Sequence, residues 1–153
     1  MIVPQVGAPA PDFDLRDQHG APVRLSGIRG RVVLLVFYPF AFTTVCTQEL
    51  LQLRDELAGR TGDGLAVLAV SCDPMFSLRV FADRESIGFA LLSDFWPHGA
   101  VARAYGDFDP ERGCPLRGTF VIDREGLVHW CEVVSDGRDI SQWWPVLDEL
   151  MAA

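Results

Sequence analysis

The stretch Pro39–Glu49, PFAFTTVCTQE, stands between two segments of different character. The apolar run VVLLVFY at residues 32–38 ends at its proline, and beyond it Leu50, Leu53 and Leu57 recur at helical spacing. Apolar residues at i, i+3 and i+7 share one face of a helix. The stretch therefore predicts a junction at which a buried strand passes into a helix.

A cysteine lies at this junction. If Thr43 is the N-cap, Cys46 is the third helical residue. The side-chain oxygen of Thr43 can then accept a hydrogen bond from the backbone N–H of Cys46. The unpaired amide dipoles of a first helical turn favour negative charge. A thiolate nucleophile benefits from such a site, so Cys46 is the candidate catalytic residue.

The helix terminus alone does not supply enough stabilisation for a reactive thiolate. A free thiol with a pKa near 8.5 is only about 3% ionised at pH 7, and lowering such a pKa to about 6 takes roughly 3.4 kcal/mol. A helix terminus contributes about 0.3–1 kcal/mol. A positive charge at about 4 Å contributes on the order of 4 kcal/mol at an effective dielectric constant near 20. A reactive thiolate at this junction therefore requires a cation from elsewhere in the chain.

The alternative is an unreactive cysteine. Cysteine is among the most buried residue types, and an isolated one usually behaves as a small hydrophobic residue. Here proline, threonine and cysteine occur together at a strand-to-helix junction. That combination favours the reactive interpretation.

Pro39, Thr43 and Cys46, at this spacing, resemble the P-x-x-x-T-x-x-C active-site motif of the peroxiredoxins, thiol peroxidases built on a thioredoxin fold. The resemblance covers nearly the whole chain and is most specific at TTVCTQEL and RGTFVID. Within the family, SDFWPHGAVARAYG is most similar to the AhpE-type one-cysteine branch. Three further segments resemble peroxiredoxin segments in the family's order: VGAPAPDFDLRDQHG, LLSDFWPHGAVARAYG and RGTFVIDREG.

The resemblance also implies roles for residues around the thiol. Arg117, in LRGTF, takes the place of the family's catalytic arginine, which would supply the required cation and donate hydrogen bonds to the peroxide. By the same comparison, Thr43 would hydrogen-bond the peroxide and Pro39 would shield the thiolate from water. Glu49 matches a position that pairs with the arginine network. It could equally be a surface carboxylate that is favourable near a helix N-terminus.

The implied function is a thiol-dependent peroxidase. Its thiolate would reduce hydrogen peroxide, organic hydroperoxides or peroxynitrite and become a sulfenic acid, which an external thiol or redoxin reduces. Position 51, where one branch carries a resolving cysteine, is leucine, and no cysteine follows Cys131. Cys114, in a Gly/Pro-containing loop, is the only serious internal candidate for a resolving cysteine. Cys72 and Cys131 are expected to be structural.

Two other functions compete with the peroxidase. A peroxide sensor or thiol-dependent chaperone would relay oxidation of Cys46 to a partner protein, but would not need the full Pro/Thr/Cys/Arg set. A disulfide reductase on the same fold is disfavoured because the sequence contains no C-x-x-C.

Composition limits the remaining possibilities. A chain of 153 residues is of single-domain size, so we expect one domain over residues 1–153. A formal charge of −8 argues against a nucleic-acid partner. We find no secretory signal and no apolar run of membrane-spanning length. Four cysteines without a C-x-x-C, a Cys/His cluster or an export signal suggest reduced thiols, a cytoplasmic location, and neither metal nor cofactor. The apolar PFAF and DFWP turns favour a homodimer or higher homo-oligomer.

The order of the elements predicts an α/β protein. We expect a small hairpin within residues 13–25, then buried strands at 31–38 and 65–71 and a short one at 89–92, with helices after Cys46, at 75–86 and at 98–105. Residues 107–118 read as a loop, 119–123 and 127–134 as a hairpin, and 139–151 as the last helix. The result is a mixed central sheet flanked by helices, as in a thioredoxin-like fold of the peroxiredoxin type.

Overall fold

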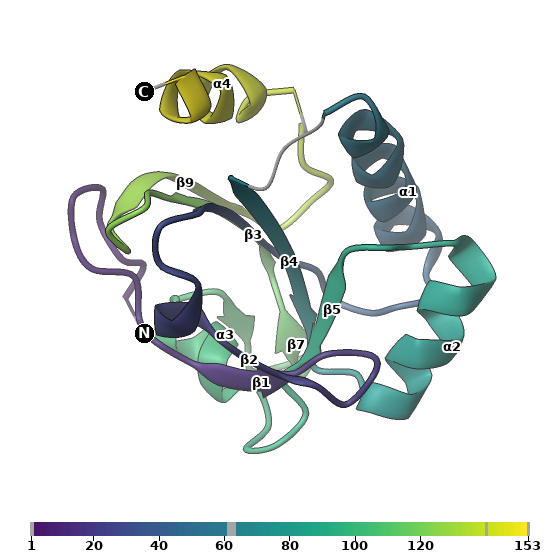
Figure 1. The fold of residues 1–153 in the computed structure, drawn as a ribbon. Helices are drawn as coiled ribbons and strands as arrows, with labels where there is room; N and C mark the ends of the chain where they lie inside the picture. Colours follow the sequence, from purple (N-terminus) through teal and green to yellow (C-terminus); the bar gives the residue numbers. More distant parts are fainter. Residues whose placement is uncertain (1, 61–63, 140, 153) are drawn as a thin grey trace.

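A seven-stranded mixed sheet forms the centre of the protein (Figure 1). The computed structural model describes residues 2–60, 64–139 and 141–152. The strand order is β2-β1-β5-β4-β3-β8-β9, in which β3, β4 and β5 are parallel and the outer pairs are antiparallel. The strands are β1 (Asp14–Arg16), β2 (Pro22–Arg24), β3 (Val32–Phe37), β4 (Leu65–Ser71), β5 (Ala90–Ser93), β8 (Arg117–Ile122) and β9 (Val128–Val134).

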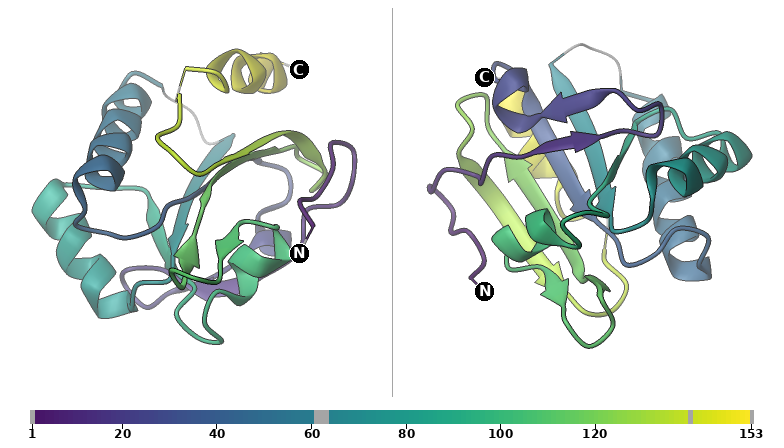
Figure 2. Two further views of the ribbon diagram at one scale, coloured as in Figure 1. Left: turned by 180° about the vertical axis from the view of Figure 1, so that it is seen from behind. Right: turned by 90° about the horizontal axis from the view of Figure 1, so that it is seen from below.

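Helices cover both faces of this sheet. Figures 1 and 2 show α1, α2 and α4 on one face, and α3 with the N-terminal segments on the other. The expected α/β architecture, a mixed sheet flanked by helices, is confirmed. The helices are α1 (Thr44–Ala58), α2 (Met75–Glu85), α3 (Ala100–Ala104) and α4 (Trp144–Ala152), with a 3-10 turn, η1 (Leu25–Ile28).

The central strand β3 is buried on both faces, as its continuous apolar sequence predicts. Because successive side chains alternate between faces, Val33, Leu35 and Phe37 pack toward α3 and the N-terminal hairpin. Val32, Leu34 and Val36 pack in a second cluster with residues of α1 and α4, among them Leu53, Trp144 and Leu147. The strand is thereby fixed between two cores, and so is the position of its carboxyl end.

Two predicted segments differ in the structure. Residues 107–118, expected to be a loop, contain a small antiparallel pair, β6 (Phe108–Asp109) and β7 (Cys114–Pro115). The last helix, expected from Asp139, begins at Trp144. The carboxylate of Asp139 accepts hydrogen bonds from the N–H (3.0 Å) and hydroxyl (2.6 Å) of Ser141, a turn that competes with helix. The expected helix also included Ile140, which lies outside the described residues.

None of the described helices is both long and apolar enough to cross a membrane. The parallel strands β3 and β4 end side by side, pairing up to Phe37 and Val70. The chain leaving β3 carries Pro39–Cys46, and the chain leaving β4 carries Ser71–Asp73. This edge of the sheet therefore brings both segments to the candidate site.

Candidate active site

The thiol lies at the predicted junction. α1 begins at Thr44 with Thr43 as its N-cap residue, so Cys46 is the third helical residue. Cys46 has no exposed surface and packs in an apolar cluster with Leu50, Leu78 and Phe81, among others. A peroxide can therefore reach its sulfur only when neighbouring side chains shift. Pro39 is also buried, at the start of the connecting loop.

The expected N-cap hydrogen bond is wrong. The side chain of Thr43 makes no capping bond to the helix. Its hydroxyl instead donates to the carbonyl of Phe40 at 2.9 Å. This bond closes a tight turn over Phe42, whose φ of 70° is uncommon for a residue with a side chain. The geometry of the loop before the helix, rather than the helix end, determines where the hydroxyl points.

Asp73 holds the same loop from the neighbouring strand. Its Oδ2 accepts the backbone N–H of Ala41 at 2.9 Å and the hydroxyl of Ser71 at 2.7 Å. The ring of Phe42 packs edge-on against Phe81 of α2, with ring centroids 5.1 Å apart. A left-handed residue persists only where its surroundings determine the conformation, and these contacts provide that restraint.

Arg117 and Glu49 form an ion pair beside the thiol-bearing turn. Glu49 lies three residues after Cys46 on α1, so the two side chains project from adjacent turns of one helix side. The Oε1 of Glu49 accepts a hydrogen bond from the guanidinium of Arg117, the first residue of β8. Both side chains are only 11% exposed. The alternative interpretation of Glu49 as a solvated surface carboxylate does not fit this geometry.

A second arginine, Arg138, completes the cluster and was not predicted from the sequence. Its backbone N–H and Nε donate to Oε2 of Glu49 at 3.0 and 3.2 Å. Its remaining nitrogens donate to Thr119 Oγ1 (3.0 Å) and to the carbonyls of Gly118 (3.0 Å) and Phe37. Burial lowers the pKa of Arg138, and the charge of Glu49 opposes that shift. Arg138 thus connects Glu49 to two central strands, β3 and β8. Arg117 donates to the other oxygen of the same carboxylate.

The other three cysteines lie outside the first turn of α1. All four cysteines are free thiols. Burial raises the pKa of Cys72 to about 12 and also raises the pKa values of Cys114 and Cys131. Cys114 lies in β7 with no exposed surface. Its role as a resolving cysteine stays a prediction, and burial disfavours its thiolate.

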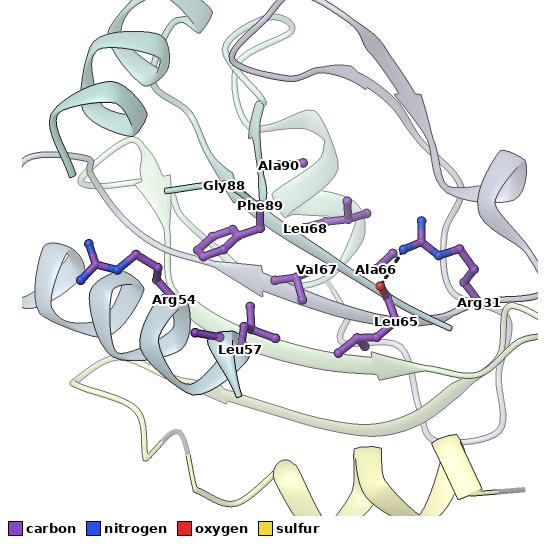
Figure 3. Close-up of a pocket in the computed structure, with 11 residues that line it drawn as sticks. Arg31, Arg54, Leu57, Leu65, Ala66, Val67, Leu68, Gly88, Phe89 and Ala90 are labelled. Atoms are coloured by element: carbon purple, nitrogen blue, oxygen red, sulfur yellow. Dashed lines mark hydrogen bonds between the residues drawn. The ribbon is translucent and has the colours of Figure 1, made fainter. Parts of the chain in front are cut away.

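One groove of the protein lies away from the candidate thiol. A groove of about 530 Å³ runs between α1 and the amino-terminal parts of β4 and β5, with Arg31 and Arg54 on opposite sides (Figure 3). None of its lining residues is a cysteine, and the thiol lies beyond the opposite, carboxyl ends of these strands. Within the described part of the chain, no cluster of three or more His, Cys, Asp or Glu could hold a metal ion.

Comparison with known proteins identifies the family. Residues 6–131 match the AhpC/TSA family model. "Alkyl hydroperoxide reductase E" of Mycobacterium tuberculosis is 49% identical over 150 residues, which cover 96% of this chain and 98% of that protein. "Thioredoxin peroxidase" of Fasciola hepatica is 32% identical, over 94% of this chain and 79% of the relative.

Solved structures agree with this assignment. "Peroxidoxin BcpB" from Mycobacterium tuberculosis superposes with a TM-score of 0.83 at 33% identity, covering 97% of both chains. "Enterococcus faecalis AhpC" gives a TM-score of 0.87 over 98% of this chain and 94% of that one, and at 24% identity it supports the fold alone. The expected thioredoxin-like fold of the peroxiredoxin type is confirmed. The chain belongs to the AhpC/TSA family and is a peroxiredoxin similar to alkyl hydroperoxide reductase E, and hence an oxidoreductase of the peroxidase class.

Proposed function

We propose that this peroxiredoxin reduces hydrogen peroxide, organic hydroperoxides and peroxynitrite with Cys46 as the attacking thiolate. One observation carries the proposal: Cys46 stands in the first turn of α1, and Glu49 anchors the Arg117 guanidinium one turn further along the same helix. The helix terminus and the arginine are the two sources of positive potential that a thiolate needs. None of the other three cysteines lies in the first turn of a helix, and burial raises their pKa values.

The reaction transfers two electrons from sulfur to the peroxide. The thiolate attacks the distal oxygen, an S–O bond forms, and the O–O bond breaks. From a hydroperoxide the leaving oxygen takes a proton and departs as water or an alcohol, and from peroxynitrite the leaving group is nitrite. Cys46 becomes a sulfenic acid. Arg117 would stabilise the charge shared by the two oxygens in the transition state, which is where binding accelerates a reaction. The Thr43 hydroxyl would join it after exchanging its bond to the Phe40 carbonyl for one to the peroxide.

The sulfenic acid is then reduced by an external thiol or a redoxin. One thiol condenses with it to a mixed disulfide and releases water, and a second thiol displaces Cys46. Cys114 is fully buried in β7, so an internal disulfide would require the β6–β7 segment to move. Because leucine stands at position 51, where one branch carries a resolving cysteine, and Cys114 would have to move, we favour an external reductant.

Exposed apolar side chains on the loop before α1, on α1 and α2, and after β5 support a homodimer or higher homo-oligomer. Phe42, Val45, Phe76, Val80, Phe95 and Trp96 are large apolar residues that remain exposed, Trp96 to 80%. Clusters of exposed apolar side chains are typical of interaction surfaces. Because Phe42 and Val45 flank Thr43, we propose that the partner copy covers the approach to the thiol. We also propose a cytoplasmic location.

Peroxide turnover tests this function. We expect stopped-flow oxidation by hydrogen peroxide, followed by turnover with a generic dithiol, in the wild-type protein. Cys46→Ser should abolish both steps, whereas Cys72→Ser and Cys131→Ser should keep the oxidation step. Rapid oxidation of Cys46→Ser would contradict the assignment of the nucleophile. Oxidation without turnover would indicate a peroxide sensor or thiol-dependent chaperone.

A further inference from the structure

Asp107 is a buried carboxyl group in the chain between α3 and β6, and the mechanism above does not use it. It has no exposed surface. Its Oδ2 accepts the backbone N–H of Gly118 at 3.1 Å, while its Oδ1 has no hydrogen-bond partner among the residues that the structure describes. Burial raises the pKa of Asp107 to about 8, against the opposing charge of Arg138. A buried polar atom without a partner is destabilising, so its presence calls for an explanation.

The other side-chain oxygen and the main-chain carbonyl of Asp107 both bind the backbone on either side of Arg117. The N–H of Leu116 donates to the main-chain carbonyl of Asp107 at 2.9 Å, and the N–H of Gly118 donates to its side chain. Asp107 thus binds both neighbours of the arginine and fixes the strand entry from which the guanidinium projects toward Glu49. The carbonyl of Gly118 in turn accepts a hydrogen bond from Arg138 at 3.0 Å.

The presence of glycine at position 118 is also explained by the Asp107 carboxyl group. A Cβ atom there would lie 2.2 Å from Oδ2 of Asp107, closer than any real contact. The backbone of Gly118 is not in the left-handed region, so no unusual conformation requires a glycine. Close approach of the Asp107 carboxyl group is therefore the reason for the missing side chain.

We infer that Asp107 is a positioning residue for Arg117, holding the arginine so that it meets Glu49 beside the Cys46 turn. This inference rests on the proposed peroxidase mechanism, in which Arg117 acts on the thiolate and the peroxide. Asp107 itself would touch neither the peroxide nor the sulfur. Its carboxyl group acts by restricting the backbone of residues 116–118.

A double-mutant cycle tests the inference. Asp107→Val removes the acceptor at similar volume, and we expect it to slow peroxide oxidation of Cys46 by about 10-fold, roughly the 1.4 kcal/mol of one hydrogen bond. Asp107→Asn retains an oxygen for the Gly118 N–H and should stay within about threefold of the wild type. In an Arg117→Ala background, Asp107→Val should change the rate by less than about twofold, because its effect passes through the arginine.

Two results would overturn the inference. One is a further 10-fold loss from Asp107→Val in the Arg117→Ala background; the other is an Asp107→Asn variant as slow as Asp107→Val. The same cycle is repeated with iodoacetamide alkylation of Cys46, which needs no peroxide. Coupling in alkylation without any peroxide reaction of the wild type would reject the proposed function and keep the positioning role. Peroxide reaction without coupling in either assay would reject only the positioning role.

Discussion

The thiol side and the arginine side of this site are built in different ways. Residues 37–46, with the strand end, the loop and the first helical turn, form one continuous segment that carries Cys46, the proposed nucleophile. The arginine side joins Glu49 to Arg117 and Arg138 across 68 and 89 residues of sequence. The thiol side is mostly apolar, whereas the arginine side concentrates buried charge. In the proposed mechanism, a locally determined segment therefore supplies the thiol, and a cluster that only the complete fold assembles supplies the cation.

Removing the shared carboxylate should have the largest effect. Glu49→Gln leaves two guanidinium groups close together with no anion between them, Arg138 being only 2% exposed. Breaking a buried ion pair by removing one partner costs about 3–5 kcal/mol, and we expect urea unfolding to show a loss of that size. The control is Asp14→Asn, which breaks the exposed Arg24–Asp14 pair and should cost less than about 1 kcal/mol. Equal losses in the two variants would show that the buried cluster is no more important than a surface pair.

Removing the Arg117 guanidinium should affect chemistry more than folding. We expect Arg117→Ala to slow peroxide oxidation of Cys46 by at least about 100-fold, since the arginine is required to supply about 3 kcal/mol of stabilisation. The pH profile of thiol alkylation should move to higher pH. Arg117→Lys keeps the charge but loses the planar donor fork, so it should be intermediate. Arg24→Ala, at an exposed arginine, should react like the wild type. Unchanged oxidation in Arg117→Ala would mean that another cation activates the thiol.

This contrast also explains what could be predicted from the sequence. The strand-to-helix junction, Thr43 as N-cap residue and Cys46 in the first turn follow from local patterns, namely an apolar run, a proline and leucines at helical spacing. The Thr43 hydrogen bond was wrong because the loop turns through a left-handed residue that no local pattern indicates. The true start of α4 was likewise missed, because a local turn at Asp139 replaces the first helical residues.

The arginine side was accessible only in part. Arg117 was selected by family resemblance, since one arginine cannot be distinguished from another by composition or spacing. Arg138 and Asp107 were missed: each lies in an irregular segment, and its partners are distant in sequence. One weak signal was present, a glycine directly after Arg117 at the start of a strand, where glycine is unfavourable unless another group approaches closely.

The pH dependence of stability should show a smaller effect that is confined to the arginine side. The pKa of Asp107 is raised from 3.8 to about 8, so the folded protein holds this proton more tightly than the unfolded chain. Its stabilising contribution is complete below pH 3.8 and is lost as the pH rises through about 8. Between pH 6 and pH 9 this loss amounts to about 2.5 kcal/mol. Arg138 is the charged group facing it and limits the rise in pKa.

The measurement compares the wild type with Asp107→Asn by chemical denaturation at pH 6 and pH 9. Groups common to both proteins cancel in the difference, so the wild type should lose about 2.5 kcal/mol more than the variant over this range. Parallel pH profiles would show that Asp107 is already ionised at pH 6, and its burial would then have to be balanced by Arg138.

Chemical trapping of the oxidised protein identifies which cysteine reacts with the peroxide. The reduced wild-type protein is treated with one equivalent of hydrogen peroxide in the presence of dimedone and analysed by peptide mass spectrometry. We expect one dimedone adduct, on Cys46, with Cys72, Cys114 and Cys131 recovered as thiols, because the proposed sulfenic acid forms at the α1 terminus and Cys114, the internal candidate, is buried in β7. A rapid and nearly complete Cys46–Cys114 disulfide, or an adduct on any cysteine other than Cys46, would contradict this expectation.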